Sequence, residues 1–283
     1  MSEPAAAATR LTGRPTTAER RLSSHLAEVT LDDGRVVMVK NADDPAAVRA
    51  EAAGLRWLAA VGAVAVPTVH GYDERCLVVD RVAEGRPTGD IAVRFGRDLA
   101  RLHGAGAPAF GAAPPEGPTE AYIGLAPMRN VPGDDWPRWY ADHRVLPYLR
   151  SAVDAGTLSP ADAKPVERVC ERLPELAGPP EPPARLHGDL WNGNLLWGAD
   201  GAAHLIDPAA HGGHRETDLA MLHLFGAPHL DRILAGYEEV APLADGWRDR
   251  IPLHQLFPLL VHTVLFGGGY AGQAVAAARS QLA

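Results

Sequence analysis

The sequence predicts an α+β fold in two lobes. We expect a small N-terminal lobe with an antiparallel sheet and one helix over residues 1–82, and a larger, mostly helical lobe over residues 83–283. Three observations favour this division: a hairpin signal near the start, a helical apolar pattern after residue 90, and mostly helical spacing from about residue 136. With 283 residues, 46% of them hydrophobic, the chain is long enough to bury two cores.

The N-terminal lobe is predicted in the order strand, strand, helix, strand. Apolar runs at 26–31 and 36–39 flank Asp32-Asp33-Gly34, and an Asp-Gly pair accepts the positive φ of a hairpin turn. Apolar residues then recur at helical spacing over 45–59. The β-rich run at 76–79 supplies a third strand.

The C-terminal lobe is expected to begin with a helix over 91–103, whose apolar residues share one face. Gly, Ala and Pro are dense at 104–118 and again at 178–183, so both segments are predicted to be irregular. Short β-like runs at 195–197 and 204–206, joined by a turn, predict a second hairpin within this helical lobe.

Composition excludes several classes of protein. Lys and Arg number 27 against 35 Asp and Glu, and a net charge of -8 opposes binding to nucleic acid. The apolar run at 257–266 is too short to span a membrane, and the start of the chain has no basic segment followed by an apolar run. Cys76 and Cys170 form no disulfide framework. We therefore expect a cytoplasmic protein with no nucleic-acid or membrane partner, and favour a monomer.

One segment carries the chemistry. His187, Asp189, Leu190 and Asn194 match the kinase catalytic loop H-R-D-L-x-x-x-N, with Gly188 in place of the Arg. Phosphoryl transfer needs a carboxylate that receives the hydroxyl proton, oxygen ligands for magnesium and a cation on the phosphates. Asp189 is the predicted base. The alternative is a plain turn whose Asp caps a helix.

The hairpin after this segment predicts the metal site. It would return Asp207 to the neighbourhood of Asp189 and Asn194, and magnesium takes one or two oxygen ligands from a protein besides those of the substrate phosphates. Asn194 and Asp207 are the predicted ligands. Alternatively, Asp207-Pro208 is a strand terminator. His187 is expected to pack and hydrogen-bond behind the loop.

The nucleotide site is predicted from the N-terminal lobe. Lys40 ends a strand and Glu51 falls on the next helix, so an ion pair would orient the Lys40 ammonium towards the phosphates of ATP. The alternative is two solvated surface charges. Residues 80–82, namely Asp80, Arg81 and Val82, take the place of a linker whose backbone would hydrogen-bond adenine, or simply leave a sheet. Ser23 and Ser24 stand where a glycine-rich phosphate loop is expected, and they serve equally well as a helix cap or a turn.

The stretches 186–194, 206–209 and 212–220 resemble the fructosamine (ketosamine) kinases, and this similarity extends over about residues 20–280. It implies a protein-kinase-like fold and the use of magnesium and ATP to phosphorylate the 3-hydroxyl of a ketosamine, either a small molecule or a glycated lysine of a protein. The phosphorylated adduct then becomes labile and releases the amine.

The resemblance also implies roles for further residues. Trp191 would lie beside the sugar, although a core aromatic under the loop is the alternative. Asp218 would hold the amides of the catalytic loop. His211, His214 and Glu216 would line the substrate pocket; they lack the closed ligand set that zinc favours.

Two other readings stay open. The first is an aminoglycoside or other small-alcohol kinase of the same fold, because a fold does not fix a substrate. The second is a nucleotide-binding pseudokinase, which the missing glycines around Ser23 favour and the set of Lys40, Glu51, Asp189, Asn194 and Asp207 opposes.

Overall fold

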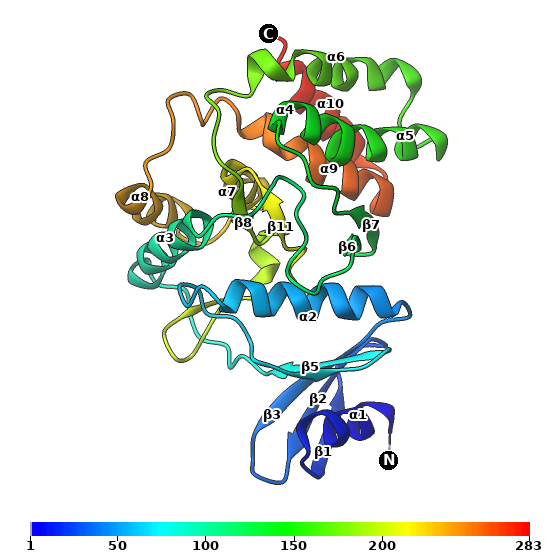
Figure 1. Cartoon of the computed structure of the whole chain (residues 1–283), viewed down its shortest axis with the longest axis vertical. Coiled ribbons are helices and arrows are strands. Elements are labelled where there is room, and N and C mark those ends of the chain that lie inside the picture. The colour runs from blue at the N-terminus through cyan, green and yellow to red at the C-terminus, as the bar shows by residue number, and fades with distance from the viewer. Residues whose placement is uncertain (1) are drawn as a thin grey trace.

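The computed structural model describes residues 2–283 and places a five-stranded antiparallel sheet at one end of the molecule and most helices at the other (Figure 1). The α+β class predicted from the sequence is therefore confirmed. The strands of the sheet run in the order β1-β2-β3-β5-β4. Their bounds are Thr16–Arg21 for β1, Leu26–Leu31 for β2, Val36–Asn41 for β3, Val69–Tyr72 for β4 and Cys76–Asp80 for β5.

Helices cover both faces of this sheet. Helix α1 (Glu3–Thr12) packs Ala7 and Ala8 against one face, and α2 (Pro45–Ala59) packs Leu55 against the other. Successive side chains of a strand point to opposite faces, so β5 sends Val78 to the α1 side and Val79 to the α2 side. Strand β5 is thereby buried on both faces.

The sequence correctly predicted the hairpin of β2 and β3 and the helix α2, but missed α1, β1 and β4. Helix α1 has clear end signals: the Ser2 hydroxyl accepts a hydrogen bond from the Ala5 amide, and Gly13 adopts φ 70° just past the last turn. Strand β1 carries few apolar side chains because most of its residues are exposed.

The helical part follows the large sheet. Its helices are α3 (Gly89–Gly104), α4 (Trp136–Tyr140), a π-helical turn (Ala141–Val145), α5 (Leu146–Asp154), α6 (Pro160–Leu176), α7 (Arg215–Leu224), α8 (Leu230–Val240), α9 (Ile251–Phe266) and α10 (Gly269–Ser280). They form two hydrophobic cores. One joins α3 and α8 to the hairpin over residues 195–205; the other joins α4, α5, α6, α9 and α10.

Three two-stranded sheets lie between these helices and the large sheet. They pair β6 (Glu120–Ile123) with β7 (Ala126–Arg129), β8 (Ala184–Leu186) with β11 (His211–Gly213), and β9 (Leu195–Trp197) with β10 (Ala203–Leu205). The β9–β10 pair is the second hairpin expected from the sequence; the other two pairs were not predicted. The β8–β11 pair holds the two ends of the segment 187–210, which contains Asp189, Asn194 and Asp207, side by side.

Within residues 2–283, none of the helices has both the length and the apolar character needed to cross a membrane. Cys76 and Cys170 are both free thiols.

Candidate active site

The loop between β8 and β9 requires glycine at position 188. Gly188 has φ 84°, which side-chain-bearing residues rarely adopt, and a Cβ on it would lie 2.1 Å from the carbonyl oxygen of Ala209. The departure from the H-R-D pattern therefore has a steric cause: the backbone of 188 passes directly against the segment after β10, and an arginine does not fit.

Asp218, on α7, holds this loop in place. Its carboxylate accepts hydrogen bonds from the backbone amides of His187 and Gly188, at 2.8 and 2.9 Å, and lies 3.2 Å from His103 Nε2. The His187 ring is buried, and its Nε2 donates to the Ile206 carbonyl at 2.9 Å. Burial lowers the pKa of His187, so the ring is neutral and serves as a tie between the loop and β10.

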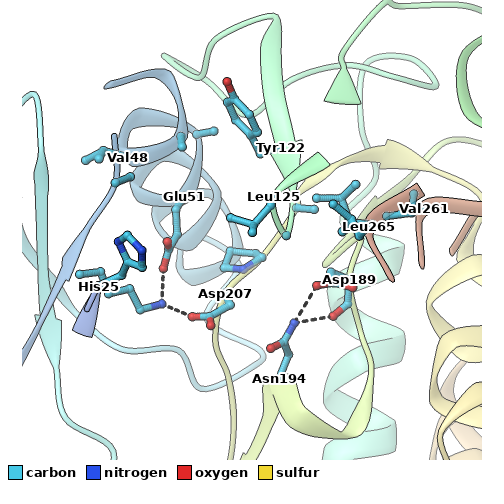
Figure 2. Close-up of a pocket in the computed structure, with 18 of the residues that line it drawn as sticks. His25, Val48, Glu51, Tyr122, Leu125, Asp189, Asn194, Asp207, Val261 and Leu265 are labelled. Carbon is cyan, nitrogen blue, oxygen red and sulfur yellow. Dashed lines mark hydrogen bonds and ion pairs between the residues drawn. The ribbon is translucent and has the colours of Figure 1, made fainter. Parts of the chain in front are cut away.

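Asp189 and Asn194 face each other across the loop (Figure 2). The Asn194 Nδ2 group donates to the backbone carbonyl of Asp189 at 2.9 Å and to its Oδ2 at 3.0 Å. Burial raises the pKa of Asp189 to about 7, with the negative charge of Asp207 adding to this effect and the hydrogen bond from Asn194 opposing it. A carboxylate with this pKa is suited to accept a proton near neutral pH.

Lys40 lies between Glu51 and Asp207. Its Nζ is 2.5 Å from Glu51 Oε1 and also contacts Asp207 Oδ1 (Figure 2). Burial acts to lower the pKa of Lys40, but the charges of the two carboxylates outweigh it and the pKa is raised, so the ammonium stays charged. Lys40 and Glu51, predicted as a pair, are thus in contact, and Asp207 joins them from the other side of the cleft.

The residues present fit a divalent cation. The amide nitrogen of Asn194 is engaged with Asp189, and among residues 2–283 its Oδ1 has no hydrogen-bond partner. Asp207 presents a half-exposed carboxylate to a cation, here the Lys40 ammonium. Asp207 has φ 53°, an unusual conformation for a non-glycine residue that is concentrated at functional sites. Two oxygen donors beside Lys40, the predicted phosphate contact, match the ligand preference of magnesium.

Two cavities adjoin at Lys40 and Asp207. The larger, of about 500 Å³, is lined by Asp189, Trp191 and Asn194 and by residues of α2, of β6 with the turn after it, and of α9. The smaller, of about 290 Å³, lies between the large sheet and the β9–β10 hairpin. Both are lined by Leu26, Lys40 and Asp207. The two spaces therefore meet at the charged cluster.

Some of the predicted nucleotide contacts line the smaller cavity and others do not. Asp80, Arg81 and Val82 line it, and within residues 2–283 the backbone amide and carbonyl of Val82 take part in no backbone hydrogen bond. Ser23 and Ser24 are exposed in the turn between β1 and β2 and line neither cavity. The Ser23 hydroxyl accepts from the His25 amide at 3.2 Å, so it supports the turn.

Trp191 lines the larger cavity, and its indole packs on Gly193 and against Phe225. A Cβ on Gly193 would lie 2.1 Å from the Trp191 indole, so only glycine lets the ring lie flat over the loop. On its other side the indole meets Phe225 edge-on at a centroid distance of 5.7 Å. The side chain is half-buried, which distinguishes it from a core aromatic.

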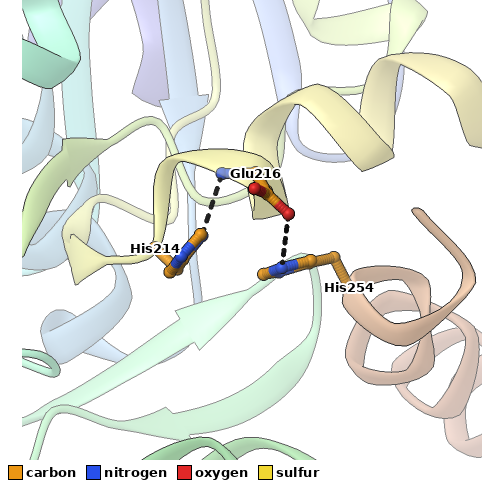
Figure 3. Close-up of side chains that lie close together, drawn as sticks. All are labelled: His214, Glu216 and His254. Atoms are coloured by element: carbon orange, nitrogen blue, oxygen red, sulfur yellow. Dashed lines mark hydrogen bonds and ion pairs between the residues drawn. The ribbon is translucent and has the colours of Figure 1, made fainter. Parts of the chain in front are cut away.

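His211, His214 and Glu216 lie outside both cavities, which corrects the expectation that they line a substrate pocket. All three are buried, with exposed fractions of 2 to 3%, and Glu216 forms a two-point ion pair with Arg250 at 2.6 and 2.9 Å. His254 Nε2 lies 3.2 Å from Glu216 Oε2 (Figure 3). The ligand atoms of His214, Glu216 and His254 lie within 4.8 Å of one another, but Arg250 occupies both oxygens of the carboxylate. The cluster is a structural anchor between α7 and α9.

Sequence reasoning missed two walls of the larger cavity. Residues 122–125, at the tip of the β6–β7 hairpin, form one wall. Val261, His262, Leu265 and Phe266, at the end of α9, form the other. The first has a detectable signal, because the apolar runs Ala121-Tyr122-Ile123 and Leu125-Ala126 flank Gly124, as in a short hairpin. The second is part of the apolar run at 257–266, which by itself indicates only burial.

Comparisons with known proteins agree with this geometry. The sequence model described as fructosamine kinase matches residues 23–283. A probable ketoamine kinase of Thermus thermophilus is 36% identical over 242 residues, which cover 84% of each chain. A solved structure from Thermobifida fusca, assigned as a fructosamine-3-kinase, superposes with a TM-score of 0.92 and 53% identity, covering 99% of this chain and 98% of that one.

A more distant structure shows the fold alone. The macrolide 2'-phosphotransferase of Brachybacterium faecium superposes with a TM-score of 0.61 at 17% identity, covering 97% of this chain and 96% of that one. The match of the sequence model over nearly the whole chain and the relative at 36% identity establish the family. The chain belongs to the fructosamine kinase family and is a phosphotransferase that acts on a sugar hydroxyl.

Proposed function

We propose that the protein transfers the γ-phosphoryl group of ATP, with magnesium, to the 3-hydroxyl of a ketosamine. The observation that carries this proposal is the meeting of the two cavities at Lys40 and Asp207, with Asp189 on the side of the larger one. A nucleotide in the smaller cavity and an acceptor in the larger would bring their reacting groups together at the charged cluster, and such positioning supplies much of the catalysis of phosphoryl transfer.

The smaller cavity suits an adenine ring. Its walls include Leu55 and Val79 on one side and Leu196 and Ile206 on the other, so a flat heterocycle would be enclosed by apolar side chains. The free backbone groups of Val82 would hydrogen-bond the edge of the base. Lys40, kept charged between Glu51 and Asp207, would then contact the phosphates.

The larger cavity suits the acceptor. Asp189 would take the proton of the attacking hydroxyl, and Asn194 orients this carboxylate through the hydrogen bond at 3.0 Å. Trp191 would offer its half-exposed ring to the apolar face of the sugar. Asn194 and Asp207 would hold the magnesium ion, which when bound neutralises charge on the phosphates.

Phosphorylation of the 3-hydroxyl would make the adduct labile and free the amine, so we propose a role in removing sugar adducts from amines, including glycated lysine. An assay of ATP turnover tests this function. Fructose and ribulose adducts of lysine are compared with aminoglycosides and with no acceptor, and phosphorus NMR identifies the product.

Turnover with a ketosamine supports the proposal. Turnover only with aminoglycosides would reject it in favour of antibiotic phosphorylation, and nucleotide binding with no turnover on any acceptor would indicate a pseudokinase.

A further inference from the structure

The mouth of the larger cavity is apolar and exposed. Leu125, at the tip of the β6–β7 hairpin, is 85% exposed, and Phe266, at the end of α9, is 66% exposed; both line the cavity. A single exposed apolar side chain is ordinary, but apolar side chains that gather at one opening mark a binding site, and here two of them border the same cavity. Figure 2 shows Leu125 facing Leu265, which lies beside Val261 above Asp189.

The two walls lie close together. A Cβ added to Gly124 would lie 3.7 Å from Leu265, so the hairpin tip passes close to α9. The α9 wall is supported by rings: His262 lies 5.3 Å from Phe225 and 5.5 Å from Phe266 between centroids. Its Nδ1 donates to the Pro258 carbonyl at 2.7 Å, which fixes the imidazole as part of this wall.

The mouth offers no lysine or arginine to a ligand. Among the residues that line the larger cavity, the Lys, Arg, Asp and Glu residues are Lys40, Glu51, Asp189 and Asp207, and all four belong to the catalytic cluster. Beside the mouth, the Asp44 carboxylate accepts hydrogen bonds from the Tyr122 hydroxyl and the Ala46 amide and adds a negative charge. A carboxylate on the outer part of an acceptor would therefore lose water there without gaining a partner.

The covalent structure of a ketosamine determines which part of the molecule lies at this mouth. If the 3-hydroxyl lies at Asp189, the nitrogen is separated from the reacting carbon by two carbon atoms, and its substituent must leave the cavity through the opening. We infer that the enzyme selects ketosamines whose amine nitrogen carries an apolar substituent without a carboxylate, with Leu125 and Phe266 as the specificity-determining residues. This inference rests on the proposed function and names the class of its acceptor.

Two acceptors that differ only in one charge test the inference. They are the fructose adduct of benzylamine and the fructose adduct of 4-carboxybenzylamine, which share the sugar, the nitrogen and the ring. The wild-type enzyme should show a kcat/KM about tenfold higher for the benzylamine adduct, mainly through KM, because contacts in an apolar site discriminate by roughly this factor.

Two variants assign the effect to the mouth. Phe266→Ser should raise KM for the benzylamine adduct and bring the ratio of the two kcat/KM values towards one. Leu125→Lys should raise kcat/KM for the carboxylate-bearing adduct, because the new ammonium pairs with it. Val240→Ser removes an apolar side chain that is 41% exposed at the end of α8, away from both cavities, and should leave the ratio unchanged. Thermal unfolding checks that each variant is folded.

The outcomes separate the inference from the function on which it rests. Equal kcat/KM values for the two adducts in the wild-type enzyme, or a ratio that Phe266→Ser and Leu125→Lys leave unchanged, overturn the inference while the proposed function stands. If neither these adducts nor the lysine adducts are phosphorylated, the proposed function itself is overturned.

Discussion

Lys40 on β3 forms an ion pair with Asp207, which follows β10 and lies 167 residues further along the chain. The pair joins the large sheet to the segment that carries the predicted metal ligands. Asp207 would exchange this ammonium for magnesium when the nucleotide binds, and Lys40 would stay beside Glu51 to contact phosphate. The same pair therefore links the fold to the proposed chemistry.

Replacing Lys40 by Met should lower kcat/KM for ATP by roughly a hundredfold or more, because a preorganised charge on the phosphates is lost. Steady-state kinetics with varied ATP measures this change. The sequence contains one other lysine, Lys164, which is exposed on α6, and Lys164→Met is the matched control. Equal activity of the two variants would contradict the role of Lys40.

The pH dependence of turnover should reflect Asp189. The base must be deprotonated to accept a proton, and burial raises its pKa to about 7. The value of kcat/KM for the acceptor should therefore rise as the pH is raised through about 7. Magnesium on Asp207 would weaken one cause of the raised pKa, so increasing magnesium should move this limb to lower pH. A profile flat between pH 5 and pH 8 would argue against Asp189 as the base.

Asp189→Asn should stabilise the fold at alkaline pH. A raised pKa in the folded state means that ionised Asp189 opposes folding; this penalty develops as pH rises from the ordinary value of 3.8 to about 7 and is complete above it. Denaturant unfolding at pH 8 should show the variant to be more stable by about 2 kcal/mol, allowing for partial exposure. The difference should vanish near pH 3.5. A variant less stable than wild type at pH 8 would contradict this account.

Glu216→Gln should damage stability and spare acceptor binding. Removing one partner of the buried Glu216–Arg250 pair leaves an uncompensated charge, at a cost of about 3 to 5 kcal/mol in the free energy of unfolding. Glu239 pairs with Arg97 at the surface, and Glu239→Gln should cost less than about 1 kcal/mol. If Glu216→Gln left the stability unchanged and raised KM for the acceptor, Glu216 would contact the substrate, and its assignment as a structural anchor would be wrong.

Local signals in the sequence were sufficient for several parts of the fold. The Asp33-Gly34 turn determines its hairpin through backbone conformation, and the helical spacing over 45–59 reflects the single face that α2 packs on the sheet. Asp189, Asn194 and Asp207 could be placed together because a short hairpin connects them. In these cases the structure depends on neighbours in the sequence.

Other parts depend on contacts between distant segments. Strand β1 has little apolar pattern because it is an edge strand, and only its pairing with β2 reveals it. The sequence around Glu216 does not indicate that Arg250 and His254 contact it from the start of α9. The three polar residues His211, His214 and Glu216 therefore suggested a substrate pocket, whereas the structure shows them buried. The apolar mouth likewise combines a hairpin and a helix that the sequence does not connect.

The most direct test of the proposed mechanism is a single-turnover measurement of phosphoryl transfer from ATP to a fructose adduct by the wild-type enzyme and by Asp189→Asn, with exposed Asp231→Asn as control. We predict that Asp189→Asn keeps its affinity for ATP and loses at least about a hundredfold in rate, while Asp231→Asn matches wild type. Transfer by Asp189→Asn at the wild-type rate would contradict the assignment of Asp189 as the base.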